Sequence, residues 1–268
     1  MKISVYCYIF NGTVMEYNIE DTLKNFTSFF DEVVVATVKS KDDTREILAK
    51  LEKIYSNLKV IDTDVKIEGS NRFDGVLKTI AMNKCTNPIR VIADFDERFI
   101  LSQRPAWDRA AERLLQVPYL DGVLIPVIDL YKDKFSIRAD QQIGQKFRLH
   151  KASVIERGVP RFAELGGGLF SASKSDSTDP LNSNKDLCNF CSLIDPIELN
   201  PVFAQNLKNF PFVVHLGVLD LARRIRINKE FWQKKWKEYD KEARVSIDIR
   251  ELDNKPSIKH NLDIGDLL

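Results

Sequence analysis

The stretch DEVVVATVKSKDDT, residues 31–44, decides the fold. Its apolar run at 33–38 predicts a buried strand, and Asp43 and Thr44 are residue types that begin helices. A strand, a polar turn and an amphipathic helix therefore follow one another, which is the unit that builds parallel sheets. The apolar stripe of the predicted helix consists of Ile47, Leu48, Leu51 and Ile54.

The same unit recurs on both sides of this stretch. Such alternation predicts an α/β fold, in which helices cover both faces of a mostly parallel central sheet. These sheets bind ligands beyond the carboxyl ends of their strands, so we expect SKDDT (40–44) and DFD (94–96) to converge there. The predicted elements are strand 3–10, helix 23–30, strand LKVID (58–62), a helix with its stripe at 73–81 and strand IRVIADFD (89–96).

The second half of the chain changes character. A Gly-Gly-Gly run among many Ser, Asp and Asn residues predicts a mobile loop over 166–184. We expect one domain over 1–225 and a helical C-terminal extension and tail over 226–268, with the last 20 or so residues polar and weakly ordered. The other predicted elements are helix 106–115, strand 122–130, hairpin-like strands at 135–138 and 146–149, and helical segments at 218–227 and 228–244.

The composition excludes several classes of protein. Hydrophobic residues make up 44% and charged residues 29% of the 268, which is a globular balance and not that of a disordered chain. With 40 Lys and Arg against 39 Asp and Glu, no basic field is present, so we expect no nucleic-acid partner. No apolar run suggests a membrane span, and a buried strand explains the apolar N-terminus better than a secretion signal.

The four cysteines give little sign of a metal knuckle. Cys188 and Cys191 are close in sequence, but no second Cys or His pair accompanies them, so reduced thiols are favoured over a zinc site. Because nothing requires an oxidising compartment, the cytoplasm is the expected location.

Asp94 and Asp96 carry the clearest chemical signal. Two carboxylates one residue apart, at the mouth of a parallel sheet, can bind a hard divalent cation that in turn holds a diphosphate. Glu97 adds a third negative group that is costly to crowd there without a cation. D-x-D also occurs in ordinary exposed loops, and it is the position after a predicted strand that favours a site.

With these residues in view, the chain resembles the family 2 glycosyltransferases, which have the Rossmann-like GT-A fold and bind nucleotide-diphospho-sugars. Members typically carry an S-x-D-x-T turn between a strand and a helix, and a later strand that ends in D-x-D. Ser40, Asp42 and Thr44 match the first motif, and Asp94 and Asp96 match the second. The resemblance covers roughly residues 1–225 and implies a Mn²⁺ or Mg²⁺ cofactor.

The resemblance also implies roles in donor binding. Lys78 lies near a basic residue that the family often keeps on the helix before D-x-D, and Arg148 in QKFRLHK matches an arginine-bearing strand. Ser40, Asp42, Lys78, Asp94 and Arg148 are therefore expected to hold the donor. Arg148 would offset negative charge on the leaving diphosphate, and a structural ion pair is the alternative role for it.

Two later segments resemble the family's remaining site residues. His215 in HLGVLD matches a C-terminal histidine, and it would join Asp94 and Asp96 as a metal ligand unless it is a structural histidine. Glu164 in GVPRFAE matches an acidic residue that would take the acceptor's proton, and a solvated loop glutamate is the alternative. Its competitors in the following loop are Asp176, Asp179 and Asp186.

The chain departs from the family at the nucleobase side. Thr37 stands where an acidic residue usually helps to hold the base, and Thr79 stands where an asparagine is usual. Asp62 and Asp64 are candidates for base or ribose contacts, with surface carboxylates as the alternative. His150 is expected at the surface, because it lies on the opposite face of its strand from Leu149.

Aromatic and basic residues share the last predicted helix. Trp232, Trp236 and Tyr239 lie on one face among lysines, which fits either packing on the catalytic domain or contact with a membrane surface. The second interpretation would bring a peripheral enzyme to a lipid-linked acceptor.

The function expected from all of this is inverting, metal-dependent sugar transfer. The donor would be a nucleotide-diphospho-sugar and the acceptor a hydroxyl of a glycan or lipid-linked glycan. One alternative is a non-catalytic relative that binds sugar nucleotides or glycans, and the departures at Thr37 and Thr79 favour this alternative. The other is a haloacid dehalogenase-type phosphatase, which usually has Thr or Val where this chain has Arg98 and its D-x-D on the first strand of its domain.

Overall fold

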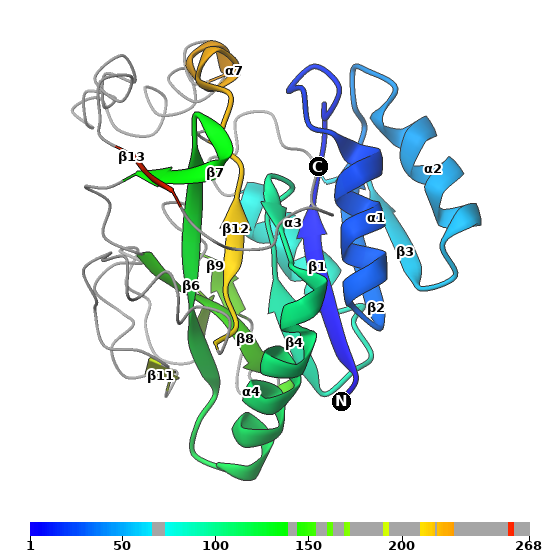
Figure 1. The fold of residues 1–268 in the computed structure, drawn as a ribbon. Coiled ribbons are helices and arrows are strands. Elements are labelled where there is room, and N and C mark those ends of the chain that lie inside the picture. The colour runs from blue at the N-terminus through cyan, green and yellow to red at the C-terminus, as the bar shows by residue number, and fades with distance from the viewer. Residues whose placement is uncertain are drawn as a thin grey trace, which may run out of the picture.

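A parallel sheet occupies the first half of the chain (Figure 1). The computed structural model describes residues 1–65, 73–138, 144–153, 160–162, 169–171, 190–192, 210–217, 219–227 and 257–259. Four strands lie in the order β3–β2–β1–β4, and each neighbouring pair is parallel. They are β1 (Ile3–Tyr8), β2 (Glu32–Val38), β3 (Leu58–Thr63) and β4 (Ile89–Ile92).

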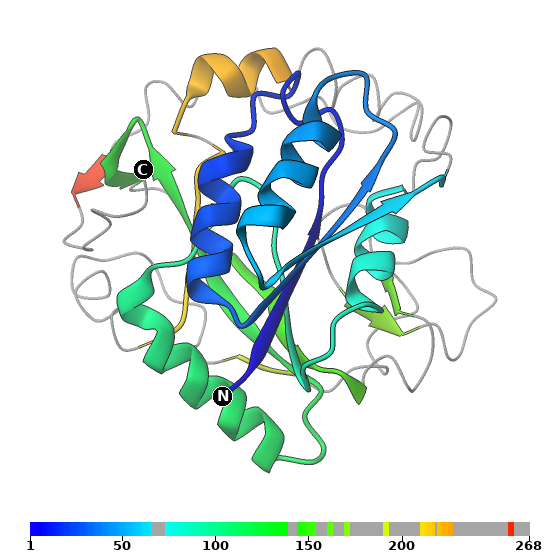
Figure 2. The same cartoon turned by 90° about the vertical axis from the view of Figure 1, so that its right-hand side faces the viewer.

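Helices cover both faces of this sheet (Figures 1 and 2). The helices α1 (Ile19–Phe29), α2 (Thr44–Ile54) and α4 (Arg104–Gln116) pack on one face, and α3 (Phe73–Met82) packs on the other. Alternate residues of β1 serve the two faces, since Val5 packs with the first group and Tyr6 with the second. The predicted α/β fold with a helix-covered central sheet is confirmed.

The second half extends the same sheet, mainly with antiparallel strands. The strand β8 (Gly144–Lys151) pairs antiparallel with β4 and with β6 (Gly122–Tyr131), and β7 (Asp133–Arg138) pairs with β6. The short strand β12 (Val213–His215) lies between β6, to which it is parallel, and β5 (Glu97–Arg98), to which it is antiparallel. This insertion of β12 is what builds the site.

The remaining described elements are short. They are η1 (Leu101–Gln103), β9 (Pro160–Phe162), β10 (Leu169–Ser171), β11 (Phe190–Ser192), α7 (Leu221–Ile227) and β13 (Ser257–Lys259). None of the described helices is both long and apolar enough to cross a membrane.

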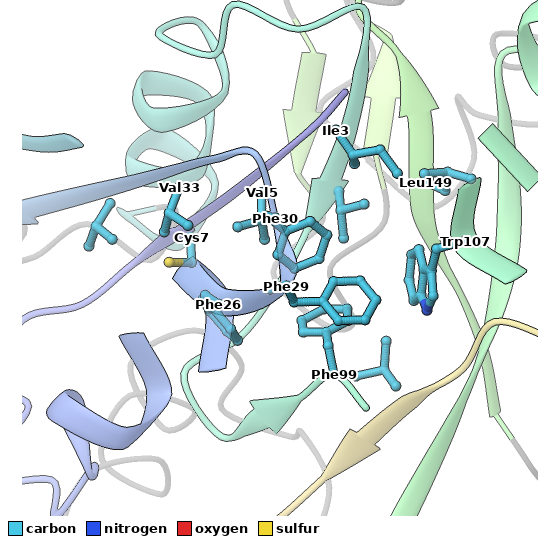
Figure 3. Packing of buried hydrophobic residues seen from close by; sticks show 14 of the residues in the cluster. Ile3, Val5, Cys7, Phe26, Phe29, Phe30, Val33, Phe99, Trp107 and Leu149 are labelled. Carbon is cyan, nitrogen blue, oxygen red and sulfur yellow. The ribbon is translucent and has the colours of Figure 1, made fainter. Parts of the chain in front are cut away.

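Aromatic side chains fill the core under α1 and α4 (Figure 3). Phe99 lies 4.6 Å from Phe30 and 5.3 Å from Trp107 between ring centroids, and Phe26 and Phe29 complete the cluster. Edge-to-face aromatic pairs are worth about 0.5–1.5 kcal/mol beyond the burial of their surface. Because Phe99 follows directly after β5, this packing anchors the segment that carries the DFD motif.

The structure corrects some of the predicted boundaries. The fourth strand ends at Ile92, so Asp94 and Asp96 stand in a turn beyond it. Residues 169–171 of the stretch predicted as a mobile loop form β10, which pairs with β9. In the tail predicted to be weakly ordered, β13 pairs with β7. The rest of both stretches, and residues 228–244, lie outside the described residues, so the boundary at 225/226 stays a prediction.

Candidate functional site

The turn after β4 is held in place by α1 and by its own backbone. Glu97 N–H donates to the Asp94 carbonyl at 3.0 Å, and Asp94 N–H donates to Glu97 Oε2 at 3.0 Å. From α1, Thr22 Oγ1 donates to the Phe95 carbonyl at 3.0 Å, and Asn25 bonds both backbone groups of Phe99. With the backbone fixed this way, the carboxylates of the DFD motif have defined positions.

Asp94 lies between two cations. Lys78 Nζ donates to its Oδ1 at 2.6 Å, and Arg148 Nη2 donates to its Oδ2 at 3.0 Å. The same Arg148 nitrogen pairs with Glu97, and the side chains of both residues are fully buried. Burial lowers the pKa of Arg148, but Glu97 and Asp94 outweigh it and hold that pKa above its ordinary value.

This arrangement bears on the roles expected for Lys78, Asp94 and Arg148. The structure brings the three together, and Asp94 keeps 33% of its side chain exposed. Arg148 has no exposed surface, so in this conformation it reaches Asp94 and Glu97 and not a ligand in solvent. Its Nε and Nη1 are buried and have no hydrogen-bond partner among the described residues.

Asp96 lies against His215. Asp96 Oδ2 is 3.2 Å from His215 Nε2, and on the other side of the ring Asp129 Oδ1 is 2.5 Å from Nδ1. The pairing of β12 with β5 and β6 produces this contact, because it sets His215 in register with both Glu97 and Asp129. Burial lowers the pKa of His215, but Asp96 and Asp129 outweigh it and raise that pKa to about 10.

Gly217 leaves room for this ring. A Cβ at position 217 would lie 2.4 Å from His215 Cε1, 2.6 Å from its Nε2 and 3.3 Å from Asp96 Oδ2. Side chains other than hydrogen would therefore displace the imidazole from Asp96.

The Asp96–His215 pair fits one edge of a metal coordination sphere. Six-coordinate cations with bonds of about 2.1 Å place neighbouring donor atoms about 3 Å apart, which is close to the separation found here. No three His, Cys, Asp or Glu side chains in the described ranges converge as a complete cation site. A cation held by Asp96 and His215 would thus need further oxygens, which phosphates and water commonly supply.

Ser40 and Asp42 hold a loop of the protein. Together with Thr44 they accept hydrogen bonds from backbone N–H groups of the loop that follows β1. Burial raises the pKa of Asp42, but hydrogen bonds from the Thr44 hydroxyl and from backbone N–H groups, that of Val14 among them, outweigh it and lower that pKa. The bonds run from Asn11 N to Ser40 Oγ (3.0 Å), from Gly12 N to Thr44 Oγ1 (2.7 Å) and from Val14 N to Asp42 Oδ2 (2.9 Å).

The same loop contacts the DFD turn through an edge-to-face aromatic pair. Arg223 of α7 lies over the Tyr17 ring, 4.9 Å from its centroid, and its Nη2 donates to the Met15 carbonyl at 3.0 Å. Tyr17 in turn packs edge-to-face on Phe95, with 6.3 Å between ring centroids. The expected convergence of the two polar turns is therefore indirect, through residues 11–17.

Three further residues named in the sequence analysis have defined places in the structure. Asp62 pairs with Arg45 of α2 at the surface, so its carboxylate is engaged within the protein. Thr37 is fully buried. His150 is also fully buried, which makes the expectation of a surface position wrong.

The position of His150 follows from the sheet pairing. Because β8 pairs with β4, His150 stands in register with Arg90 on the face covered by α3. Its Nδ1 lies 2.9 Å from the Lys151 carbonyl, which can only accept, so Nε2 accepts the Tyr6 hydroxyl at 3.0 Å. Burial lowers the pKa of His150 to about 4, and the ring is neutral.

Sequence reasoning missed Asp129 and Gly217. The signal for Asp129 was a single carboxylate within the otherwise apolar strand GVLIPVIDLY (122–131), and the signal for Gly217 was a glycine two residues after the candidate histidine. Glu164, Asp176, Asp179 and Asp186 lie outside the described residues, as do Trp232, Trp236 and Tyr239.

Comparisons with known proteins give likenesses of fold only. No family model and no curated sequence matches the chain. It is similar to Staphylococcus aureus TarS 1–349 in complex with UDP-GlcNAc (12% identity, TM-score 0.42, 94% of this chain and 78% of that one). In another TarS 1–349 structure the match has 15% identity and a TM-score of 0.41, and it covers 62% of this chain and only 51% of that one.

A mannosyltransferase is similar to a comparable degree. The mannosyltransferase PcManGT from Pyrobaculum calidifontis, in complex with GDP-Man and Mn²⁺, matches at 15% identity with a TM-score of 0.44, over 84% of this chain and 64% of that one. The functional conclusion below therefore rests on the side chains of this chain.

Proposed function

We propose that this protein is a glycosyltransferase that moves a sugar from a nucleotide-diphosphate donor to a hydroxyl group. One observation carries the proposal, which is the set of groups at the carboxyl end of β4. There, Asp96 Oδ2 lies 3.2 Å from His215 Nε2. Asp94, on the same turn as Asp96, is held by Lys78 of α3 and Arg148 of β8. Cation ligands beside fixed basic groups suit a metal-bound diphosphate.

The residues at this site have different roles in the proposed reaction. Asp96 and His215 would hold Mn²⁺ or Mg²⁺, which supplies positive charge to the departing diphosphate. Asp94, one-third exposed, is the group that the donor would meet first, and Lys78 and Arg148 fix its orientation. Fixed charges at the place where charge develops are a large contribution to catalysis.

Two parts of the proposal rest on the family resemblance. Glu164 would accept the proton of the acceptor hydroxyl, and transfer would invert the anomeric carbon. A general base of this kind contributes about 10²–10⁴ in rate. Glu164→Gln should therefore lower transfer by about that factor while donor and cation binding stay nearly intact. Full activity of Glu164→Gln would move the search to Asp176, Asp179 and Asp186.

The acceptor in this proposal is a glycan or a lipid-linked glycan. The aromatic and basic residues at 229–241 would bring the enzyme to a membrane surface that carries such a lipid. Sedimentation with anionic vesicles, for the wild-type chain and for a variant with Trp232→Ala and Trp236→Ala, tests this part separately from transfer.

The experiment that tests the central proposal is calorimetry of donor binding. UDP, GDP and their sugar conjugates are titrated into the full chain with Mn²⁺ and with a chelator. We expect binding of one nucleotide class that depends on the cation, and about a 100-fold loss of it in Asp96→Asn, since even an indirect contact to a metal accounts for about 10–100-fold. Equal affinity in the chelator would contradict the role of the metal.

Product analysis separates the alternatives. Slow release of free sugar from the bound donor, without an acceptor, identifies a transferase. Binding with no turnover would identify a non-catalytic relative. The buried Thr37, which stands in place of a base-binding carboxylate, favours that alternative. Release of phosphate from a simple monoester would identify a phosphatase.

A further inference from the structure

Asp129 has no part in the roles assigned so far, yet it lies closer to the His215 ring than Asp96 does. Its Oδ1 lies 2.5 Å from Nδ1, and the two residues stand in register on β6 and β12. The ring's other nitrogen faces Asp96 at 3.2 Å. The histidine is thus held between a strand position and the DFD turn.

A carboxylate on Nδ1 decides which nitrogen can bind a cation. An ionised carboxylate only accepts hydrogen bonds, so Asp129 keeps a proton on Nδ1, and when a cation replaces the proton on Nε2 the free lone pair stands on that nitrogen. That nitrogen is the one beside Asp96 Oδ2, and a side chain at position 217 would displace it from there. Partners of this kind orient metal-binding histidines and make them more basic.

We propose that Asp129 is a positioning residue that selects the Nε2 lone pair of His215 for a cation and thereby favours Mn²⁺ over Mg²⁺. The proposal rests on the proposed function, because it needs a cation at the Asp96–His215 edge. Mg²⁺ binds almost entirely to oxygen, whereas affinity for nitrogen donors rises along the series that begins with Mn²⁺. A basic, correctly oriented imidazole therefore strengthens Mn²⁺ binding more than Mg²⁺ binding.

The matched variants are Asp129→Asn and Asp108→Asn. An asparagine at 129 has nearly the same shape, but its NH₂ group can turn to Nδ1 and place the ring proton on Nε2, where it blocks a cation. Asp108 is a suitable control, since its exposure of 29% is close to the 27% of Asp129 and it pairs with Arg104, away from the turn.

The experiment measures Mn²⁺ affinity by the loss of the free-ion electron paramagnetic resonance signal, in the full chain with UDP or GDP present, and Mg²⁺ affinity by competition. We expect Asp129→Asn to weaken Mn²⁺ binding by about 10–100-fold. Mg²⁺ binding should weaken less, so that the ratio of the two affinities falls. Asp108→Asn should leave both affinities unchanged.

A second measurement needs no variant. With histidine labelled by ¹⁵N at Nε2 alone, bound Mn²⁺ should show a hyperfine coupling to ¹⁵N, and with the label at Nδ1 it should show none of that size. Coupling to Nδ1, or to neither nitrogen, would overturn the proposal even if Asp129→Asn fails to fold.

The outcomes separate the two proposals. If the wild-type chain binds Mn²⁺ but Asp129→Asn keeps the same affinities for both cations, the role of Asp129 is wrong and the metal site stands. If the wild-type chain binds no Mn²⁺ with either nucleotide, the metal-dependent function and the role of Asp129 fall together.

Discussion

The two carboxylates of the DFD turn lie one residue apart in sequence and in different surroundings. Asp94 meets Lys78 and Arg148, and Arg148 also meets Glu97. Asp96 meets His215, whose other nitrogen meets Asp129. Ammonium and guanidinium groups bind carboxylates but not metals, whereas imidazole can do both. The first set therefore builds a fixed scaffold, and the second supplies groups that can hold a cation.

The largest effect should follow from breaking the first set at Glu97. Glu97→Ala removes the fully buried partner of Arg148, leaves the partly exposed Asp94 as its described carboxylate partner, and removes the acceptor of Asp94 N–H. Removing one partner of a buried ion pair costs about 3–5 kcal/mol of stability. We expect a loss of that size in the free energy of unfolding, measured by urea denaturation.

Asp108→Ala is the control for this loss. It removes a partly exposed carboxylate paired with Arg104, and surface pairs of this kind are worth about 0–1 kcal/mol. Equal losses in the two variants would mean that the Arg148–Glu97 pair has no special weight.

The next effect concerns His150, a fully buried histidine whose ring contacts the Tyr6 hydroxyl and the Lys151 carbonyl. Its pKa is lowered to about 4 from 6.5, so between these values the unfolded chain binds a proton that the folded chain does not. The neutral, buried His150 therefore makes the free energy of unfolding depend on pH. That free energy is highest above pH 6.5 and falls by about 3 kcal/mol as the pH falls toward 4.

Unfolding measured from pH 7 to pH 4 checks this contribution. In His150→Gln, the loss of unfolding free energy between pH 7 and pH 4 should be smaller by about that amount. In His215→Asn the loss should be as large as in the wild-type chain, because the pKa of His215 is raised and not lowered. An unchanged decline in His150→Gln would show that His150 is not the group responsible.

The smallest effect should come from Gly217→Ala, which acts on the second set. The added Cβ would come within 2.6 Å of His215 Nε2 and must push the ring from Asp96. We expect about a 10-fold loss of Mn²⁺ affinity in the presence of nucleotide, the lower end for an indirect contact to a metal.

Gly12→Ala is the matched control for crowding. Its Cβ would lie 2.5 Å from Ile9 Cδ1, the flexible end of a side chain away from the cation site. It should lower stability without changing Mn²⁺ affinity. A similar loss of affinity in both variants would show that general strain, and not the imidazole, sets the affinity.

Local patterns predicted the elements well. The stripe at Ile47, Leu48 and Leu51 lies on α2, and the run at 33–38 lies within β2. Both follow from side-chain periodicity and helix-start residues within a few positions. The prediction of a surface position for His150 was wrong because it depended on contacts between distant segments. The pairing of β8 with β4, under α3, covers both faces of this strand, and no local pattern shows that pairing.

Local sequence patterns specify the α/β order of the first hundred residues and place Asp94 and Asp96 at the carboxyl end of the fourth strand. The tertiary structure alone decided what each carboxylate meets. Arg148 arrives on β8, His215 on β12 and Asp129 on β6, and these strands are joined to the turn by pairings between distant segments. Hydrogen bonds of this kind form between backbone groups that every residue carries, so no local pattern specifies which strands will meet.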